Sequence, residues 1–75
     1  MIPEHQRAIL TVDLPENNLQ AGDMGTVVHI YDDQQAYEVE FFTAAGQTLD
    51  VVTVEASQVR PASQRDVLHV REILA

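Results

Sequence analysis

The chain has 75 residues, 45% of them hydrophobic, with twelve acidic residues, four arginines, no lysine and no cysteine. Its formal net charge of −8 argues against nucleic acids and anionic membranes as partners, because both need Lys and Arg to neutralise their phosphates. The absence of cysteine excludes disulfides, thiolate metal sites and cysteine nucleophiles.

The first third of the chain predicts a lead-in, a strand and an anchored loop. Residues 1–7 form the lead-in, and the β-type run 8–12 is the first strand. A polar loop follows over 13–21, and its apolar residues Leu14 and Leu19 are expected to pack against the core.

The centre of the chain predicts a hairpin. Residues 22–31 and 36–42 are two β-type runs, and the polar connector 32–35 between them has hairpin length. The first run is apolar on both faces, which indicates a long, bent strand wrapped by others. Gly25 would permit such a bend or a bulge, since it has no Cβ.

The second strand of this hairpin alternates with a period of two. Tyr37, Val39 and Phe41 fall on one face, while Glu38 and Glu40 fall on the other. This pattern predicts that the three apolar side chains are buried and that the two glutamates face solvent.

The next part predicts two more strands separated by turns. Residues 43–47 form a turn with Gly46 at positive φ, and the β-branched run 48–54 is a strand. Residues 55–58 form a short turn, with one turn of 3-10 helix as an option, before the short strand 59–61. That strand ends in a proline, which favours an edge position.

The tail, residues 62–75, predicts a helix of about three turns. Ser63 and Asp66 have the spacing of a capping box. Three apolar residues would share one face of this helix: Val67, Val70 and Leu74. Ile73 would lie beside them.

Short strands separated by turns in so small a chain favour a barrel that closes partly on itself. The segments that carry a family resemblance are Gly22-Asp23-Met24-Gly25-Thr26-Val27, Tyr37-Glu38-Val39-Glu40-Phe41 and Val59-Arg60-Pro61. They resemble the DUF4926 family of small bacterial domains over residues 8–61. The resemblance implies an SH3-like β-barrel, akin to the C-terminal domain of nitrile hydratase β subunits, and it implies no established activity.

The expected architecture is therefore all-β: a small, partly open SH3-like barrel of about five strands over 8–61, with a C-terminal helix over 62–75. The tail lies outside the resemblance.

The sequence predicts neither catalysis nor a cofactor or metal site. The serine-hydrolase elbow, the zinc-binding His-Glu-x-x-His motif and the glycine-rich phosphate loop do not occur in it. His5, His29 and His69 lack the spacing of metal ligands. Glu38 and Glu40 would lie roughly 7 Å apart on one strand, which is typical of a solvated face.

One group of residues predicts a protein-binding patch. Phe42 follows Phe41 directly and is expected to point outward. Together with Val52 it would form an apolar spot ringed by the acids Glu38, Glu40 and Asp50, a pattern typical of protein-binding surfaces. The alternative is that the C-terminal helix packs onto this face and hides it.

The leading functional hypothesis is a non-catalytic protein–protein interaction module whose acidic face binds a basic protein. One alternative is a small acidic inhibitor or antitoxin-like partner of a basic protein, and another is an accessory domain or subunit of an enzyme. A simpler interpretation is that the negative charge only keeps the domain soluble. We expect a cytoplasmic protein without a membrane span. Because the core is small, homodimerisation through an edge strand or the C-terminal helix is a further expectation.

Overall fold

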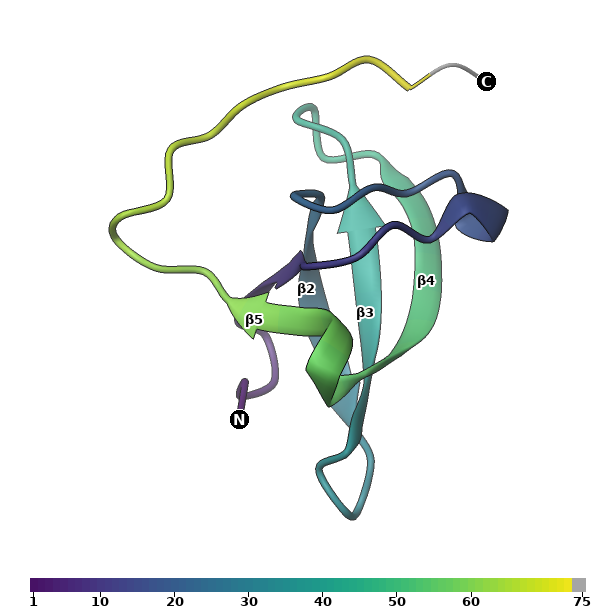
Figure 1. The fold of residues 1–75 in the computed structure, drawn as a ribbon, viewed down its shortest axis with the longest axis vertical. Coiled ribbons are helices and arrows are strands. Elements are labelled where there is room, and N and C mark those ends of the chain that lie inside the picture. The colour runs from purple at the N-terminus through teal and green to yellow at the C-terminus, as the bar shows by residue number, and fades with distance from the viewer. Residues whose placement is uncertain (74–75) are drawn as a thin grey trace.

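A computed structural model describes residues 1–73, which form a five-stranded antiparallel sheet and two short 3-10 turns (Figure 1). The strands are β1 (Arg7–Leu10), β2 (Met24–Ile30), β3 (Ala36–Phe42), β4 (Thr48–Glu55) and β5 (Val59–Pro61). The 3-10 turns are η1 (Pro15–Asn17) and η2 (Ala56–Gln58). The all-β class is therefore confirmed.

The strand order is β4-β3-β2-β1-β5, so the two edge strands of the sheet follow each other in the sequence. The single turn η2 joins them (Figure 1). A connection this short requires the sheet to curl, because its two edges would otherwise lie a full sheet width apart. The inner face of the curled sheet then encloses the core.

The alternation predicted for β3 is confirmed. Tyr37, Val39 and Phe41 are at most 2% exposed, whereas Glu38 and Glu40 are only partly covered on the opposite face. The remaining buried members of the core come from the other four strands, from the lead-in and from the loop before β2: Ile2, Ala8, Leu10, Leu19, Val27, Val54 and Val59. Burial of these apolar side chains is the main stabilising contribution to the sheet.

The lead-in is anchored to this core. Ile2 is 3% exposed, and its backbone N–H donates a hydrogen bond of 3.1 Å to the Tyr37 hydroxyl. The His5 N–H donates to the Val27 carbonyl oxygen at 2.7 Å, so the segment continues the pairing of β1 with β2 ahead of β1. Tyr37 can be buried because its one polar atom has this partner.

Strand β2 combines a bulge with a close approach to β3. Val27 pairs with Val39 and His29 pairs with Glu38, so Val28 is the extra residue of a bulge. Gly25 has another purpose: a Cβ there would lie 2.6 Å from both the Glu40 carbonyl oxygen and Val39 Cγ1. Only glycine lets the two backbones come this close.

The loops follow the sequence pattern closely. Leu19 is 2% exposed, and Leu14 packs beside it through a small β-bridge, as predicted. Gly46 has φ of 87°, which confirms the positive φ expected there. Strand β1 ends at Leu10, two residues earlier than predicted, and Val12 is 38% exposed.

The predicted C-terminal helix is wrong, because residues 62–73 adopt no helix. The capping pair does form, with the Ser63 N–H donating to Asp66 Oδ2 at 2.7 Å, but no helical turn follows it. Val67 and Val70 are 90% and 78% exposed, so the apolar stripe has no surface to pack on. A helix of three turns is marginal without such packing, and β-branched residues weaken it further. Leu74, the third residue of the stripe, lies outside the described residues.

We predict that Gly25→Ala lowers the free energy of unfolding by about 1–3 kcal/mol, because the new methyl group forces β2 away from β3. Urea denaturation followed by circular dichroism measures this change. Gly46→Asn is the matched control, since Gly46 has open space around it and Asn tolerates positive φ. Equal unfolding midpoints for wild type and Gly25→Ala would show that the strands are not in such close contact.

Candidate protein-binding surface

The sheet divides the five predicted binding residues between its two faces. Glu38, Glu40 and Phe42 alternate with the buried residues of β3, so they lie together on the outer face. Asp50 pairs with Phe41 and Val52 pairs with Val39, which places both on the inner face. The structure therefore brings three of the five residues together and separates the other two from them.

The two inner residues have structural contacts. Val52 is partly buried and packs against the core. Asp50 accepts a hydrogen bond of 3.2 Å from Asn17 Nδ2, which links β4 to η1, and one of 2.9 Å from the Val51 N–H. Both side chains serve to close the inner face of the sheet.

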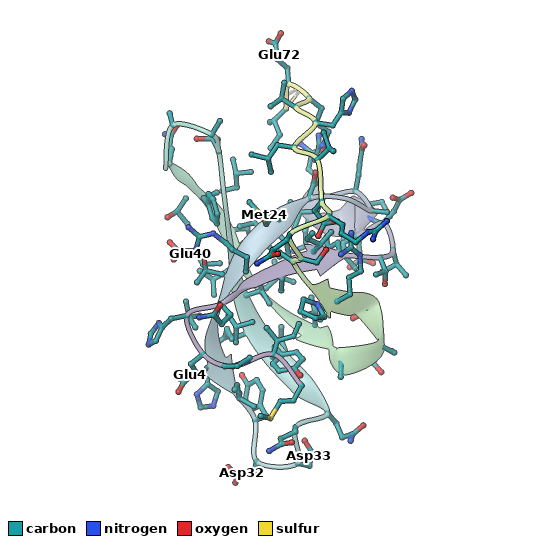
Figure 2. All side chains as sticks on the ribbon, turned by 90° about the vertical axis from the view of Figure 1, so that its left-hand side faces the viewer. Glu4, Met24, Asp32, Asp33, Glu40 and Glu72 are labelled. Atoms are coloured by element: carbon teal, nitrogen blue, oxygen red, sulfur yellow. The ribbon has the colours of Figure 1, made fainter. Side chains whose placement is uncertain are left out.

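Val51 is the residue that the sequence prediction missed. It pairs with Glu40, so it lies on the outer face beside that glutamate, and it is 48% exposed. We define the outer patch as Glu38, Glu40, Phe42 and Val51. Figure 2 shows Glu40 and, on the neighbouring strand β2, Met24.

Threonine hydroxyls hold both glutamates of the outer patch. Thr53 Oγ1 donates to Glu38 Oε1 at 3.0 Å, and Thr48 Oγ1 donates to Glu40 Oε2 at 2.5 Å. Both threonines lie on β4, so each bond crosses from the edge strand to its neighbour. A hydrogen bond to a charged acceptor is stronger than a neutral one, and the two carboxylates are therefore held in place along the sheet.

Phe42 forms the end of the outer patch nearest to β1. It is partly exposed, and the Arg7 guanidinium lies 5.0 Å from the centre of its ring. Arg7 Nη1 also donates to Thr26 Oγ1 at 2.6 Å, which fixes the guanidinium over the ring. This cation–π contact covers part of the aromatic surface.

Two ion pairs hold the segment after β5 to the rest of the domain. Arg60 Nη2 lies 2.6 Å from Asp66 Oδ1, and Arg71 Nη2 lies 2.5 Å from Asp23 Oδ2. They involve two of the twelve acidic residues and two of the four arginines. Ten carboxylates and two guanidiniums outside these pairs then set the field around the domain, which is strongly negative.

Asp23 combines two roles. Its carboxylate accepts a hydrogen bond of 2.8 Å from the Gln20 N–H, which caps the turn before β2, and it also binds Arg71. Burial raises the pKa of Asp23, but the hydrogen bonds from Arg71 and from the Gln20 N–H outweigh it, so this pKa lies below its ordinary value. Hydrogen bonds from Arg60 and from the Ser63 N–H hold the pKa of Asp66 well below its usual range.

Two shallow hollows flank η1, with volumes of about 260 and 220 Å³. Asp13 lies at one and Glu16 at the other. Within residues 1–73, no three His, Asp or Glu side chains come together as metal ligands would. His29 instead stands edge-on to Tyr31, with ring centres 4.7 Å apart. In the same part of the chain, no helix has the length and apolarity that a membrane crossing requires.

The model of the family described as "Domain of unknown function (DUF4926)" matches residues 4–61, which include all five strands. The chain belongs to the DUF4926 family. The match ends with β5, so the segment after Pro61 lies outside the part of this DUF4926 protein that the family model covers. No curated protein and no solved structure matches the chain.

We predict a pH-dependent contribution of Arg71 to stability. The folded-state pKa of Asp23 is depressed, so the ion pair stabilises the fold above the unfolded-state pKa and loses this effect as pH falls through the folded-state pKa. Arg71→Ala should therefore lower the free energy of unfolding at pH 7 by less than about 1 kcal/mol, as expected for a pair near the surface. As the pH falls below 3.8, the ordinary pKa of an aspartate, the difference from wild type should shrink.

Urea unfolding of wild type and Arg71→Ala from neutral to acidic pH measures this difference. Arg65→Ala is the matched control, because it removes the same charge from the same segment. A difference that persists unchanged in acid would mean that Arg71 stabilises the fold by packing and not through Asp23.

Proposed function

We propose that this DUF4926 domain is a non-catalytic protein-binding module that presents its outer patch to a basic protein. The observation that carries the proposal is the pair Glu38 and Glu40, which Thr53 and Thr48 hold beside the exposed Val51. Ordered carboxylates next to an apolar side chain offer a basic partner both charge and contact area.

The charge of the whole domain supports the same proposal. The chain carries a net charge of −8, and two of its four arginines are in ion pairs within the domain. A field of one sign raises the rate at which an oppositely charged protein arrives, and this effect weakens as salt is added. Nucleic acids carry the same sign of charge as the domain and would be repelled.

The segment after β5 leaves the outer patch available. Its Ala62 N–H donates to the Arg7 carbonyl oxygen, Asp66 binds Arg60, and Arg71 binds Asp23. These contacts attach the segment to β1, to β5 and to the loop before β2, so they hold it away from β4. The helix that would have hidden the patch is not formed.

We also infer that the curled sheet is an SH3-like barrel, in a cytoplasmic protein of bacterial type. The strand order and the single turn η2 between β4 and β5 support the barrel. The lack of cysteine fits a reducing compartment. An SH3-like barrel serves many roles, so the proposed function depends on the outer patch and not on the fold.

The proposal predicts a partner whose binding depends on salt and on the two glutamates. The immobilised domain should retain a basic protein from a lysate of its native cells at low salt and release it at high salt. Glu38→Gln combined with Glu40→Gln should weaken the purified pair by about tenfold, which corresponds to about 1.4 kcal/mol. Isothermal titration with the captured protein measures this change.

The control variant is Asp32→Asn combined with Asp33→Asn, which removes the same charge from the turn between β2 and β3 (Figure 2). It should keep most of the affinity. Equal losses for both double variants would show that overall charge alone matters and would reject the outer patch. A column that retains no basic protein at low salt would count against the module itself.

A further inference from the structure

The segment after β5 presents apolar side chains to solvent. We call residues 62–73 the C-terminal arm; it leaves β5 and arcs back around the end of the sheet (Figure 1). Val67, Leu68 and Val70 are 90%, 79% and 78% exposed. Three large apolar side chains within four residues form a cluster that the domain itself does not cover.

The arm is nevertheless attached at both ends, and the contacts there are polar. At its base, Asp66 accepts hydrogen bonds from Arg60 Nη1 at 3.0 Å and Nη2 at 2.6 Å. At its tip, Arg71 donates to Asp23 Oδ1 through Nε at 3.0 Å and to Oδ2 through Nη2 at 2.5 Å. Arg71 Nη2 also donates to the Asn18 carbonyl oxygen at 3.2 Å.

The tip recognises a defined group of acceptors. Arg71 makes a two-pronged contact with one carboxylate, and the neighbouring carbonyl oxygen completes the set. Such a fork-shaped arrangement is selective for geometry as well as for charge. Every copy of the chain carries the same acceptors. A second copy therefore presents the Asp23 carboxylate and the Asn18 carbonyl oxygen in the arrangement that Arg71 binds.

We propose that two copies of this protein exchange their C-terminal arms and form a symmetric dimer. Arg71 of each copy binds Asp23 of the other, and Val67, Leu68 and Val70 pack between the two copies. The exchange replaces an ion pair by an identical one and adds apolar burial that a single copy lacks. Exchange of an identical element is a low-cost route to a dimer for this reason.

The base of the arm stays attached to its own domain, and the residues beyond it provide the hinge. The Ala62 N–H bonds to the Arg7 carbonyl oxygen next to the end of β5, and the Arg60–Asp66 pair fixes the turn that follows. Residues 67–70 lie beyond this turn and have no strand or helix to break. The arm can therefore point to its own Asp23 or to that of a second copy without a change in the sheet.

The net charge of −8 on each copy opposes the dimer. At about 0.15 M salt, charges farther apart than about 8 Å are largely screened, so the repulsion between the two sheets is weak. The buried apolar cluster and the two exchanged ion pairs act at contact distance. The dimer and the proposed binding of a basic protein are independent, because the arm and the outer patch are different surfaces.

The first experiment is sedimentation equilibrium of the full chain over a wide concentration range at 0.15 M salt. Wild type should show a monomer–dimer equilibrium. The variant with Val67→Ser, Leu68→Ser and Val70→Ser should raise the dimer dissociation constant by about a hundredfold or more. Val51→Ser, on the edge strand β4, is the control and should leave the constant unchanged.

The second experiment distinguishes exchange from simple contact by reversing the charges of the ion pair. Asp23→Arg alone and Arg71→Asp alone each place like charges together, so each variant should be mainly monomeric. When the two variants are mixed, the arm of each finds an opposite charge on the other copy. The mixture should therefore form a heterodimer with an affinity near that of wild type.

Three results would overturn the proposal. The first is a wild-type protein that is monomeric at every concentration. The second is a dimer that survives the three serine substitutions but is lost with Val51→Ser, which would assign the contact to the edge of β4. The third is a mixture of the charge-reversed variants that stays monomeric, which would mean that Arg71 binds Asp23 of its own chain.

Discussion

The close approach of β2 and β3 at Gly25 sets the register of the sheet. Because a Cβ at this position would collide with the backbone of Glu40, glycine keeps Gly25 opposite Phe41 and Val27 opposite Val39. A slip of one residue would turn every side chain of β3 to the other face. The buried core and the acidic outer patch are thus two results of one backbone contact.

The sequence predicts the extent of both β3 and β4, but it predicts which side chains face outward only for β3, and the reason is physical. In β3 only one face is apolar, so the alternation identifies Glu38 and Glu40 as outer residues. In β4, Val51 and Val52 are adjacent and equally apolar, and their own sequence does not decide which of them is buried. Pairing with Val39 places Val52 on the buried face. The register of β4 also depends on the irregularity between the pairs Phe41–Asp50 and Phe42–Thr48. The C-terminal helix fails similarly, because a local pattern indicates amphipathicity but not whether a surface exists to pack against.

The arginines help to explain the electrostatic character of the molecule. Arg60 and Arg71 bind Asp66 and Asp23, and Arg7 lies over Phe42, so these cations are used to organise the domain. In the part of the chain that the structure describes, these two ion pairs use only two of the twelve acidic residues, and the surface field follows from this imbalance. The chain contains only four cations, and three of them are used in contacts within the domain. The surface is therefore left strongly negative.

The hydrogen bonds from Thr53 and Thr48 to the two glutamates have a consequence for selectivity. A free glutamate side chain samples many rotamers, and binding must then remove that freedom at an entropic cost. Here the cross-strand hydroxyls restrict the carboxylates before any partner arrives. A surface of this kind distinguishes cationic proteins by the spacing of their charges, whereas a flexible acidic tail would respond mainly to how many charges they carry.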